Sequence, residues 1–211
     1  MDLKMGNVWG KVVSVEQKKA DKSKKPYLIL TIECGNSRLG AVKAYGRIWN
    51  ENRIQPFLDF YKAHAQETIR LTGFFSQYAG DDGKVMSNYT FTRWQTDPEK
   101  EAKAVFVLKG EVLGTETDTQ ALHVLVTTEG TDEYQETKEK FTVYVHPEAV
   151  FQGYHSFAGF DEIEVGHQVE VSGYLRTRDP EDEFGLSSTD VRPYAMRIKK
   201  IATAEAEPAP Y

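Results

Sequence analysis

The sequence has little of what secreted, membrane-bound and metal-dependent proteins rely on. Cys34 is the only cysteine among 211 residues, which excludes an internal disulfide and a cluster of thiolate metal ligands. We expect it to fill space at the end of a strand. No hydrophobic run is long enough to cross a membrane, and the first residues lack the apolar segment of a secretory signal. We therefore expect a cytoplasmic protein.

Motifs for catalysis are also missing. The five histidines have no metal-ligand spacing, and the chain contains neither a phosphate-binding glycine loop nor a Gly-x-Ser-x-Gly elbow. Residues 80–83 (GDDG) hold two carboxylates, but they lie between two strand-like segments and lack the other ligands of a calcium loop. We interpret them as a turn. The sequence thus predicts no enzyme, no metal site and no cofactor.

What the sequence does contain is a strand-like segment that occurs twice. Residues 69–75 (IRLTGFF) and 169–175 (VEVSGYL) alternate apolar with polar residues and continue with a hydroxyl residue, a glycine and an aromatic residue. Alternation with period two indicates a half-buried strand, and the glycine indicates a bend or bulge. Four further pairs of segments match at similar offsets, which predicts an internal duplication. These pairs are 8–12 with 108–112, 27–32 with 121–126, 44–45 with 143–144, and 89–91 with 194–196.

The duplication predicts two domains that differ in charge. We expect a first domain over residues 1–97, a linker over 98–103, a second domain over 104–203 and a disordered tail over 204–211. Residues 1–100 hold 16 Lys and Arg against 11 Asp and Glu, a net charge of +5, whereas residues 101–211 hold 10 against 21, a net charge of -11. The overall charge of -6 therefore does not exclude nucleic acid as a partner.

The order of predicted elements indicates an all-β fold with a minor helix. The helix is expected to run from an Asn50 or Asn52 cap to Ala65, with Pro56 in its first turn, and to cover the open end of a barrel. Three strands before a helix and two after it is the order of the five-stranded OB-fold barrel. The second domain repeats this order with an irregular connection in place of the helix, so we predict two tandem OB-fold barrels. The expected strands are 7–15, 27–33, 39–49, 69–75 and 85–94, then 105–113, 121–128, 140–146, 169–175 and 193–201.

Basic and aromatic residues interleave on one predicted surface of the first domain. Single strands of nucleic acid are held by a cationic groove and by aromatic faces on which bases stack. In an OB-fold this groove crosses strands two and three, between the loop joining strands one and two and the loop joining strands four and five. The candidate contacts are Lys18, Lys19, Lys22, Lys24 and Lys25 in a flexible loop, Tyr27, Lys43, Tyr45, Arg47 and Trp49 on strands, and Tyr78 and Lys84 in the second loop.

The second domain departs from this pattern. Its corresponding loops, 115–118 and 179–183, are acidic, and only Tyr144 and His123 are expected on the matching face. One interpretation is that this domain binds a partner protein or its own twin. The other is that its negative loops repel duplex and non-specific contacts while aromatic residues on its strands still stack bases.

The two copies of the strand with its internal glycine, within the repeated strand order, resemble the tandem OB-fold single-stranded DNA-binding proteins of bacteriophages and the related cellular replication proteins. The resemblance covers both repeats and depends on architecture rather than on a diagnostic motif. It implies a protein that coats single-stranded DNA, largely without sequence preference, in replication, recombination or repair, in the host-cell cytoplasm if the protein is viral. It also implies that replication or recombination proteins are recruited through an acidic tail or the acidic second domain.

A structural or adaptor protein is the alternative function. Such a protein would use both barrels for protein contacts, and the acidic second domain and the isoelectric point near 5.5 favour it. The sequence does not decide between DNA and RNA, because that choice depends on contacts to the 2′-hydroxyl group.

Overall fold

Strands make up most of the part of the chain that the computed structural model describes, which is residues 3–36, 38–79, 85–128, 137–155, 159–177 and 191–201. Within these ranges there is one α-helix, so the predicted all-β class with a minor helix is confirmed. The elements are β1 (Leu3–Lys19), β2 (Pro26–Glu33), β3 (Lys43–Ile48), α1 (Glu51–His64), β4 (Ile69–Ala79), β5 (Val85–Thr96), β6 (Lys103–Glu116), β7 (Ala121–Thr128), β8 (Thr137–Gln152), the 3-10 helix η1 (Gly159–Glu162), β9 (Gln168–Thr177) and β10 (Val191–Lys200).

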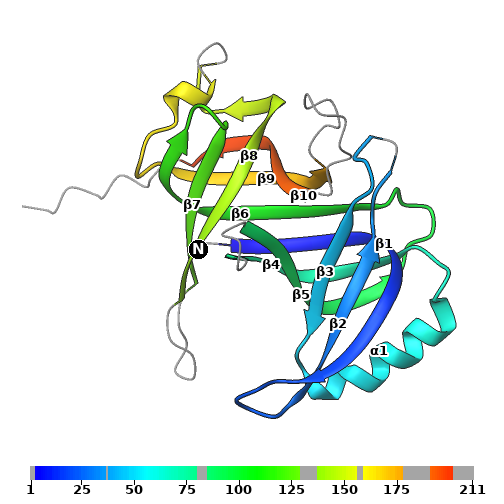
Figure 1. Ribbon diagram of the computed structural model, residues 1–211. Coiled ribbons are helices and arrows are strands. Elements are labelled where there is room, and N and C mark those ends of the chain that lie inside the picture. The colour runs from blue at the N-terminus through cyan, green and yellow to red at the C-terminus, as the bar shows by residue number, and fades with distance from the viewer. Residues whose placement is uncertain are drawn as a thin grey trace, which may run out of the picture.

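The strands form one sheet that closes on itself at two places. Its order is β2-β3-β5-β4-β1-β6-β7-β8-β10-β9. Additional pairing of β1 with β2 and of β6 with β9 completes a ring of five strands in each half, which we call the first ring and the second ring. In both rings the third strand pairs in parallel with the fifth, as β3 with β5 and β8 with β10. The strand order is therefore the same in both halves (Figure 1).

The first strands of the two rings pair with each other and join the halves. β1 and β6 run antiparallel over residues 3–9 of β1 and lie side by side across the centre of Figure 1. The Phe75 ring of β4 stacks on Phe106 of β6 at 5.1 Å and on Phe141 of β8 at 5.8 Å. All three rings are buried in a core that is continuous through both halves. The position of one ring against the other is thus fixed by the sheet as well as by the connecting chain.

Alternation along the strands determines which side chains enter the core. The predicted inward residues of β1 and β2 are buried, and the residues between them face outward, as their period of two requires. Fully burying the side chain of one of the valine, leucine or isoleucine residues in this inward set contributes about 1.5–3 kcal/mol. These inward residues are Val8, Gly10, Val12, Leu28, Leu30 and Ile32.

The helix α1 covers one end of the first ring. The Asn50 side chain accepts a hydrogen bond from the Asn52 backbone N–H, so Asn50 is the N-cap, which is one of the two predicted caps. Pro56 lies in the second turn, not in the first as predicted, because the helix begins at Glu51. Phe57 is buried and meets the Trp94 ring of β5 edge to face at 5.3 Å. This contact fastens the helix to the ring.

A glycine in the fourth strand of each ring permits a backbone approach that a side chain would block. A Cβ atom at Gly73 would lie 1.9 Å from the Thr90 carbonyl oxygen, and one at Gly173 would lie 1.8 Å from the Tyr194 carbonyl oxygen. The pairing register shifts beside both glycines, where β5 and β10 carry an extra residue. The bulge predicted from the repeated glycine is confirmed in both copies.

Several predicted strand boundaries are wrong. β1 extends to Lys19, so Lys18 and Lys19 belong to a strand and not to a loop, because β2 supplies backbone partners for both. β4 extends to Ala79 because β5 pairs with it over its whole length, and Tyr78 therefore lies on a strand. β3 is shorter than predicted at both ends: it begins at Lys43 and ends at Ile48, so Trp49 follows the strand directly. β8 continues to Gln152, where an irregular connection was expected, because β10 pairs with its second part.

The register between the two rings also differs from the predicted one. A Cβ atom at Gly10 would meet the Glu33 carbonyl oxygen, and one at Gly110 would meet that of Leu125. Glu33 of β2 therefore corresponds to Leu125 of β7, which differs by two residues from the predicted match. With this correspondence, Thr31 and not Ile29 is the counterpart of His123. A shift of two keeps every side chain on its face of the sheet.

In the last strand of each ring the error is one residue, and a one-residue slip exchanges the two faces. The carbonyl groups that lie against Gly73 and Gly173 belong to Thr90 and Tyr194, so these two residues correspond. The sequence match had paired Tyr194 with Tyr89. Tyr89 is fully buried, whereas Tyr194 is only partly covered and faces outward.

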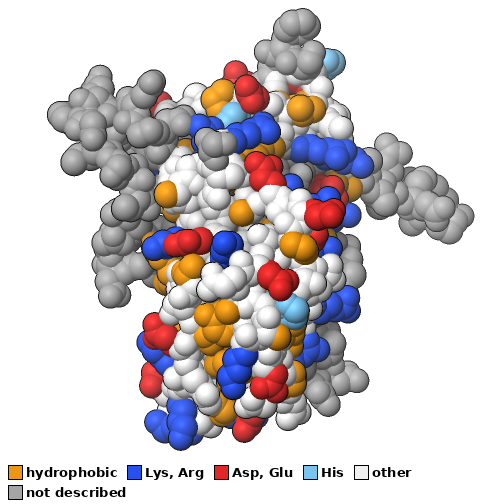
Figure 2. All heavy atoms as spheres, turned by 90° about the vertical axis from the view of Figure 1, so that its right-hand side faces the viewer, with side chains coloured by type: hydrophobic (Ala, Val, Ile, Leu, Met, Phe, Trp, Pro, Cys, Tyr) orange, Lys and Arg blue, Asp and Glu red, His pale blue; other side chains and the backbone are white. Residues whose placement is uncertain are grey.

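The surface carries charges of both signs. Figure 2 shows Lys and Arg side chains interspersed with Asp and Glu over one face of the molecule, and hydrophobic side chains in small separate groups. That face therefore has no wide area of a single charge. No helix in the described ranges is long and apolar enough to cross a membrane.

The close approach at Gly73 leads to a prediction about stability. We expect Gly73→Ala to lower the free energy of unfolding by roughly 1–3 kcal/mol, because the new methyl group forces the β4 and β5 backbones apart. Gly114→Ala is the matched control, since no described atom lies within 4 Å of a Cβ atom there. Urea unfolding measures both variants, and equal midpoints for the two would contradict this account of the bulge.

Candidate nucleic-acid interface

Outward side chains of β1, β2 and β3 form rows across three neighbouring strands. Tyr45 of β3 lies opposite Thr31 of β2, and Arg47 lies opposite Ile29. Tyr45 and Trp49 are 43% and 44% exposed, so both rings are open to solvent. We call this surface the first-ring face. It is defined by Lys18, Tyr27, Lys43, Tyr45, Arg47 and Trp49.

Tyr27 and Trp49 form a stacked pair at one end of the first-ring face. Their ring centroids are 4.4 Å apart, and the ring planes differ by 24°. The Arg47 guanidinium carbon lies 5.6 Å from the centre of the Trp49 ring. An exposed aromatic ring beside a guanidinium group offers a base a stacking surface and its phosphate a charge. The structure thus brings together three of the predicted contact residues.

The lysine-rich turn adjoins the same end of the first-ring face. Lys18 lies opposite Tyr27, and the chain then turns through Ala20, whose N–H donates to the Lys25 carbonyl at 2.9 Å. Lys24 adopts a positive φ of 56°, which tightens the turn. The side chains around this turn are exposed, so their charges reach solvent beside the stacked pair. The turn lysines are Lys19, Lys22, Lys24 and Lys25.

Acidic residues reduce the positive charge on the strands themselves. Glu16 forms an ion pair with Lys18 at 3.5 Å, and Glu33 lies opposite Lys43. The positive charge beside the stacked pair therefore comes mainly from Arg47 and the turn lysines. The end of the first-ring face that holds the stacked pair is therefore its most positively charged part.

Other predicted residues lie away from the first-ring face. Tyr78 lies on β4, opposite Met86 of β5, and is 49% exposed. Tyr144 lies on β8 in the second ring. Lys84 falls outside the described residues, as do the predicted turn at 80–83 and the tail at 204–211.

His123 faces outward on β7, as predicted, and is held by two hydrogen bonds. Its Nδ1 atom lies 3.0 Å from the Thr142 hydroxyl oxygen, and its Nε2 atom lies 2.9 Å from Glu116 Oε1. Hydrogen bonding from His123, followed by that from Thr119, lowers the pKa of the Glu116 carboxyl group. His123 therefore organises the surface locally and does not stack in the open as Trp49 does.

Sequence reasoning selected Tyr144 on the outer face of the second domain but missed the aromatic and basic residues that surround it on β8, β10 and β9. The Tyr144 and Tyr194 rings are 6.1 Å apart, and the Arg192 guanidinium carbon lies 4.7 Å from the centre of Tyr144. Arg192 in turn lies opposite Arg176, and Tyr194 opposite Tyr174. We call this group the second-ring cluster. It consists of Tyr144, His146, Tyr174, Arg176, Arg192 and Tyr194.

The segment match concealed this cluster, and the contact that the structure shows at the repeated glycine corrects the match. Counting from Gly173 places Tyr194 on the outer face, whereas the segment match pairs it with the buried Tyr89. The acidic residues of the predicted loop at 179–183, which lies outside the described residues, also outweigh the arginines on either side of it when charge is counted by segment. The basic residues of the cluster stand out only when the charges on the strands are counted separately from the charges in the loops.

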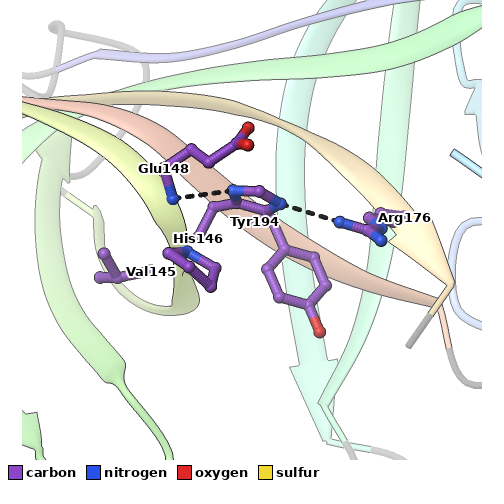
Figure 3. Close-up of a pocket in the computed structure, with 6 residues that line it drawn as sticks. Val145, His146, Glu148, Arg176 and Tyr194 are labelled. Atoms are coloured by element: carbon purple, nitrogen blue, oxygen red, sulfur yellow. Dashed lines mark hydrogen bonds between the residues drawn. The ribbon is translucent and has the colours of Figure 1, made fainter. Parts of the chain in front are cut away.

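A cavity lies within the second-ring cluster (Figure 3). It has a volume of about 450 Å³, and His146, which lines it, is only 9% exposed. The His146 Nδ1 atom accepts a hydrogen bond from the Glu148 backbone N–H at 3.1 Å, and Nε2 lies 2.8 Å from Arg176 Nη1. The residues that line the cavity are Val145, His146, Pro147, Glu148, Arg176 and Tyr194.

Comparisons with known proteins bear on the fold. No protein-family model and no curated protein sequence matches this chain. The solved wild-type single-stranded DNA binding protein from Thermus aquaticus is similar with a TM-score of 0.57 and 14% identity, over 98% of this chain and 97% of that chain. A deletion mutant of the same protein is similar with a TM-score of 0.54 and 14% identity, over 98% of both chains. The predicted resemblance is confirmed at the level of the fold.

Two features of the described residues bear on metal and thiol chemistry. No group of three or more His, Cys, Asp or Glu side chains within the described ranges is arranged to hold a metal ion. Cys34 is fully buried, and its Sγ atom lies 3.6 Å from the Val42 carbonyl oxygen. Burial raises the pKa of the Cys34 thiol to about 12, so it stays protonated at neutral pH. Its predicted role as a space-filling residue at the end of a strand agrees with this position.

The raised pKa of Cys34 predicts slow thiol chemistry. At pH 8 we expect Ellman's reagent to modify Cys34 no faster than the protein unfolds, because the thiol is both protonated and enclosed. In denaturant the single thiol should react at once. Absorbance at 412 nm as a function of urea concentration follows the reaction, and fast labelling of the folded protein would contradict the burial of this residue.

Proposed function

We propose that this protein binds single-stranded DNA without catalysis and largely without sequence preference, and that the first-ring face is its main contact surface. The observation that carries the proposal is the stacked pair of Tyr27 and Trp49 beside Arg47 and the turn lysines. Every base offers a face to an aromatic ring, and cationic side chains neutralise phosphates whatever the sequence. Similarity of fold to a single-stranded DNA binding protein supports the same function.

In this proposal each ring of five strands is an OB-type barrel. The first strand pairs with the second and fourth, and the third pairs with the fifth, in both rings. The groove of an OB barrel crosses its second and third strands, and β2 and β3 carry most of the first-ring face. We propose one barrel over residues 1–97 and the other over 104–203, as copies of one ancestral unit.

The connection between the proposed barrels is attached to the first ring. The Trp9 indole N–H donates to Asp97 Oδ2 at 2.8 Å, and the Asn36 side-chain amide donates to the Ala102 carbonyl at 2.8 Å. These bonds hold both ends of residues 97–102. A connection anchored in this way suits a protein whose two barrels act on one strand of DNA rather than as independent modules.

The cellular role that we propose is to coat exposed single strands during replication, recombination or repair. Binding by stacking and phosphate contacts suits that role, because the exposed sequence is arbitrary. The acidic second half is then available for partner proteins of those pathways, whose basic surfaces it would attract.

Replacing Trp49 tests the stacking surface. We expect Trp49→Ala to weaken binding of a labelled oligothymidine by about 1–3 kcal/mol, the usual contribution of one base stacked on one aromatic ring. Fluorescence anisotropy measures the dissociation constant, and an unlabelled duplex of equal length should fail to displace the single strand.

Phe74→Ala is the matched control for Trp49→Ala. Phe74 is 45% exposed, close to the 44% of Trp49, but lies on β4 outside the first-ring face. The control should bind as the unaltered protein does. Unchanged affinity in the Trp49 variant would remove stacking from the proposal, and no binding at low salt by the unaltered protein would overturn the proposal itself.

Replacing the lysines at the turn tests the phosphate contacts. With Lys18, Lys19, Lys22, Lys24 and Lys25 changed to glutamine, we expect the slope of log affinity against log salt to fall by about 0.7 for each phosphate that the variant no longer neutralises. Anisotropy titrations at several salt concentrations give the slope. Lys62→Gln with Lys199→Gln, both far from the turn in sequence, is the control, and an unchanged slope in the five-lysine variant would exclude the turn from the interface.

A further inference from the structure

We infer that the outer surface of β1, β4, β5 and β6 around Trp9 is a second contact site for the bound DNA strand, at which three basic side chains hold phosphates. This inference rests on the proposed function, because it adds a site for the same ligand. We call this surface the outer-face site. It consists of Asn7, Trp9, Arg70, Arg93 and Lys103.

Trp9 lies between two cations on neighbouring strands. β1 pairs with β4 on one side and with β6 on the other, and Trp9 lies opposite Arg70 in the first pairing and opposite Lys103 in the second. The Arg70 guanidinium carbon lies 5.0 Å from the centre of the Trp9 ring, and Lys103 Nζ lies 5.6 Å from it. Cation–π contacts thus hold both cations beside one indole ring.

The Arg70 guanidinium group is oriented with one edge free for a ligand. Its Nε and Nη2 atoms donate to the Asn7 side-chain oxygen at 3.2 and 3.1 Å, and the Thr72 hydroxyl donates to the same oxygen at 2.7 Å. Within the described residues Nη1 has no hydrogen-bond partner, so the edge formed by Nη1 and Nη2 can donate two parallel hydrogen bonds. A phosphate group accepts such a pair of bonds from arginine.

Carboxylates compensate little of the positive charge at the outer-face site. Arg93 of β5 is exposed and lies opposite Thr72, so it adds a third cation to this face. In the part of the chain that the structure describes, none of the three basic residues forms an ion pair with Asp or Glu. The Asp97 carboxylate accepts the Trp9 N–H at 2.8 Å, and Glu99 and Glu101 of the connection are exposed. The charges of the three cations are therefore available to phosphates.

The corresponding positions of the second ring compensate their own charges. Counting from the matched glycines, the cross-strand pair of Trp9 and Arg70 corresponds to that of Lys109 and Glu170. Lys109 Nζ lies 3.6 Å from Glu170 Oε2, so these two side chains form an ion pair. An arginine beside an indole ring in the first ring thus stands where the second ring has an ion pair. This difference favours the first ring as the place of a further anion contact.

β1 joins the outer-face site to the first-ring face. Trp9 and Lys18 lie nine residues apart on this strand, a span of at most about 30 Å, and both side chains point to the outside of the ring. Val13 is an extra residue in the pairing with β2, and β1 bends on its way to the lysine-rich turn (Figure 1). Lys11, opposite Glu33, is exposed between the two sites. A DNA strand held at the turn can therefore continue along β1 to Trp9.

This continuity favours DNA over a protein as the ligand of the outer-face site. A second copy of this chain is a poor ligand, because a two-fold contact between two such faces would place like charges against each other. An acidic protein would compete with the DNA strand that the adjoining first-ring face already holds. Phosphates of that same strand need no second encounter, so they reach the three cations at a high effective concentration.

The length of the bound strand separates the two sites experimentally. One OB fold covers about 4–16 nucleotides, so an oligothymidine of about 8 nucleotides reports on the first-ring face and one of about 30 reports on both sites. We expect Arg93→Gln with Lys103→Gln to weaken binding of the longer strand about tenfold. Its salt slope should fall by about 1.4, because each lost phosphate contact contributes about 0.7. Fluorescence anisotropy should show no change for the shorter strand.

The second ring supplies a matched control. Arg93 and Arg197 lie opposite the residue that precedes the matched glycine in each ring, and Lys109 lies on β6 as Lys103 does. Arg197→Gln with Lys109→Gln removes the same charge from side chains that contact Gln152 and Glu170. This control should bind both strands with the salt slopes of the unaltered protein.

The outcomes distinguish the outer-face site from the proposed function. If the Arg93 and Lys103 variant binds the longer strand as the unaltered protein does, while Trp49→Ala weakens both strands, the outer-face site is wrong and the proposed function stands. If the unaltered protein binds neither strand, the proposed function fails. Sedimentation velocity without DNA tests the alternative ligand, since a changed oligomeric state with an unchanged salt slope would assign this face to a second copy.

A labelling measurement in the unaltered protein needs no substitution. An N-hydroxysuccinimide ester acetylates accessible lysines, and mass spectrometry of the digest gives the rate at each position. We expect the longer strand to slow acetylation of Lys103 and of the turn lysines, and the shorter strand to slow that of the turn lysines alone. Lys109 is the reference and should react at one rate throughout. An unchanged rate at Lys103 with saturating longer strand would overturn the outer-face site.

Discussion

The pairing of β1 with β6 is the constraint on which the relation between the two surfaces depends. Each ring completes its own cycle of strands, but their first strands are neighbours in one sheet. The Gln77 side chain of β4 adds to this join, because its amide donates to the Thr142 carbonyl of β8 at 2.9 Å and accepts from the Thr142 N–H at 2.8 Å. Lys4 and Glu139 form an ion pair across the same boundary. With the rings held in this way, the Leu39 carbonyl of the first half accepts hydrogen bonds from Thr177 at the end of β9.

Much of the fold could be predicted because alternation is a local signal. A strand with one face in the core must alternate, so the buried set of β1 and β2 follows from the sequence without knowledge of their partners. The repeated glycine is equally local, since the close backbone approach at Gly73 and Gly173 leaves room for no other residue. The stacked pair of Tyr27 and Trp49 belongs to the same class, because outward positions on adjacent strands follow from the predicted order.

Register between the copies could not be predicted from the same signal. Alternating segments match almost as well after a shift of two residues, so the sequence alone does not distinguish Ile29 from Thr31 as the counterpart of His123. In the last strands the segment match is wrong by one residue, which pairs Tyr194 with the buried Tyr89 and so exchanges the faces. The bulge lies at the same place in both copies and does not shift one against the other. The acidic residues of the loops add to this error, because they outweigh the arginines of the strands when charge is counted over whole segments.

Net charge and local charge act over different distances, which reconciles a net charge of -6 with the cationic residues of the first-ring face. At physiological salt, charges in solvent are screened beyond about 8 Å, so the field of the whole second half has little influence on a phosphate already in contact. Charges close to the contact surface dominate instead, and these favour the first ring, because residues 1–100 carry a net charge of +5. In the proposed function a strand therefore first meets the turn lysines and the Tyr27–Trp49 pair, so the local charge of the first ring, and not the net charge of the protein, governs its capture.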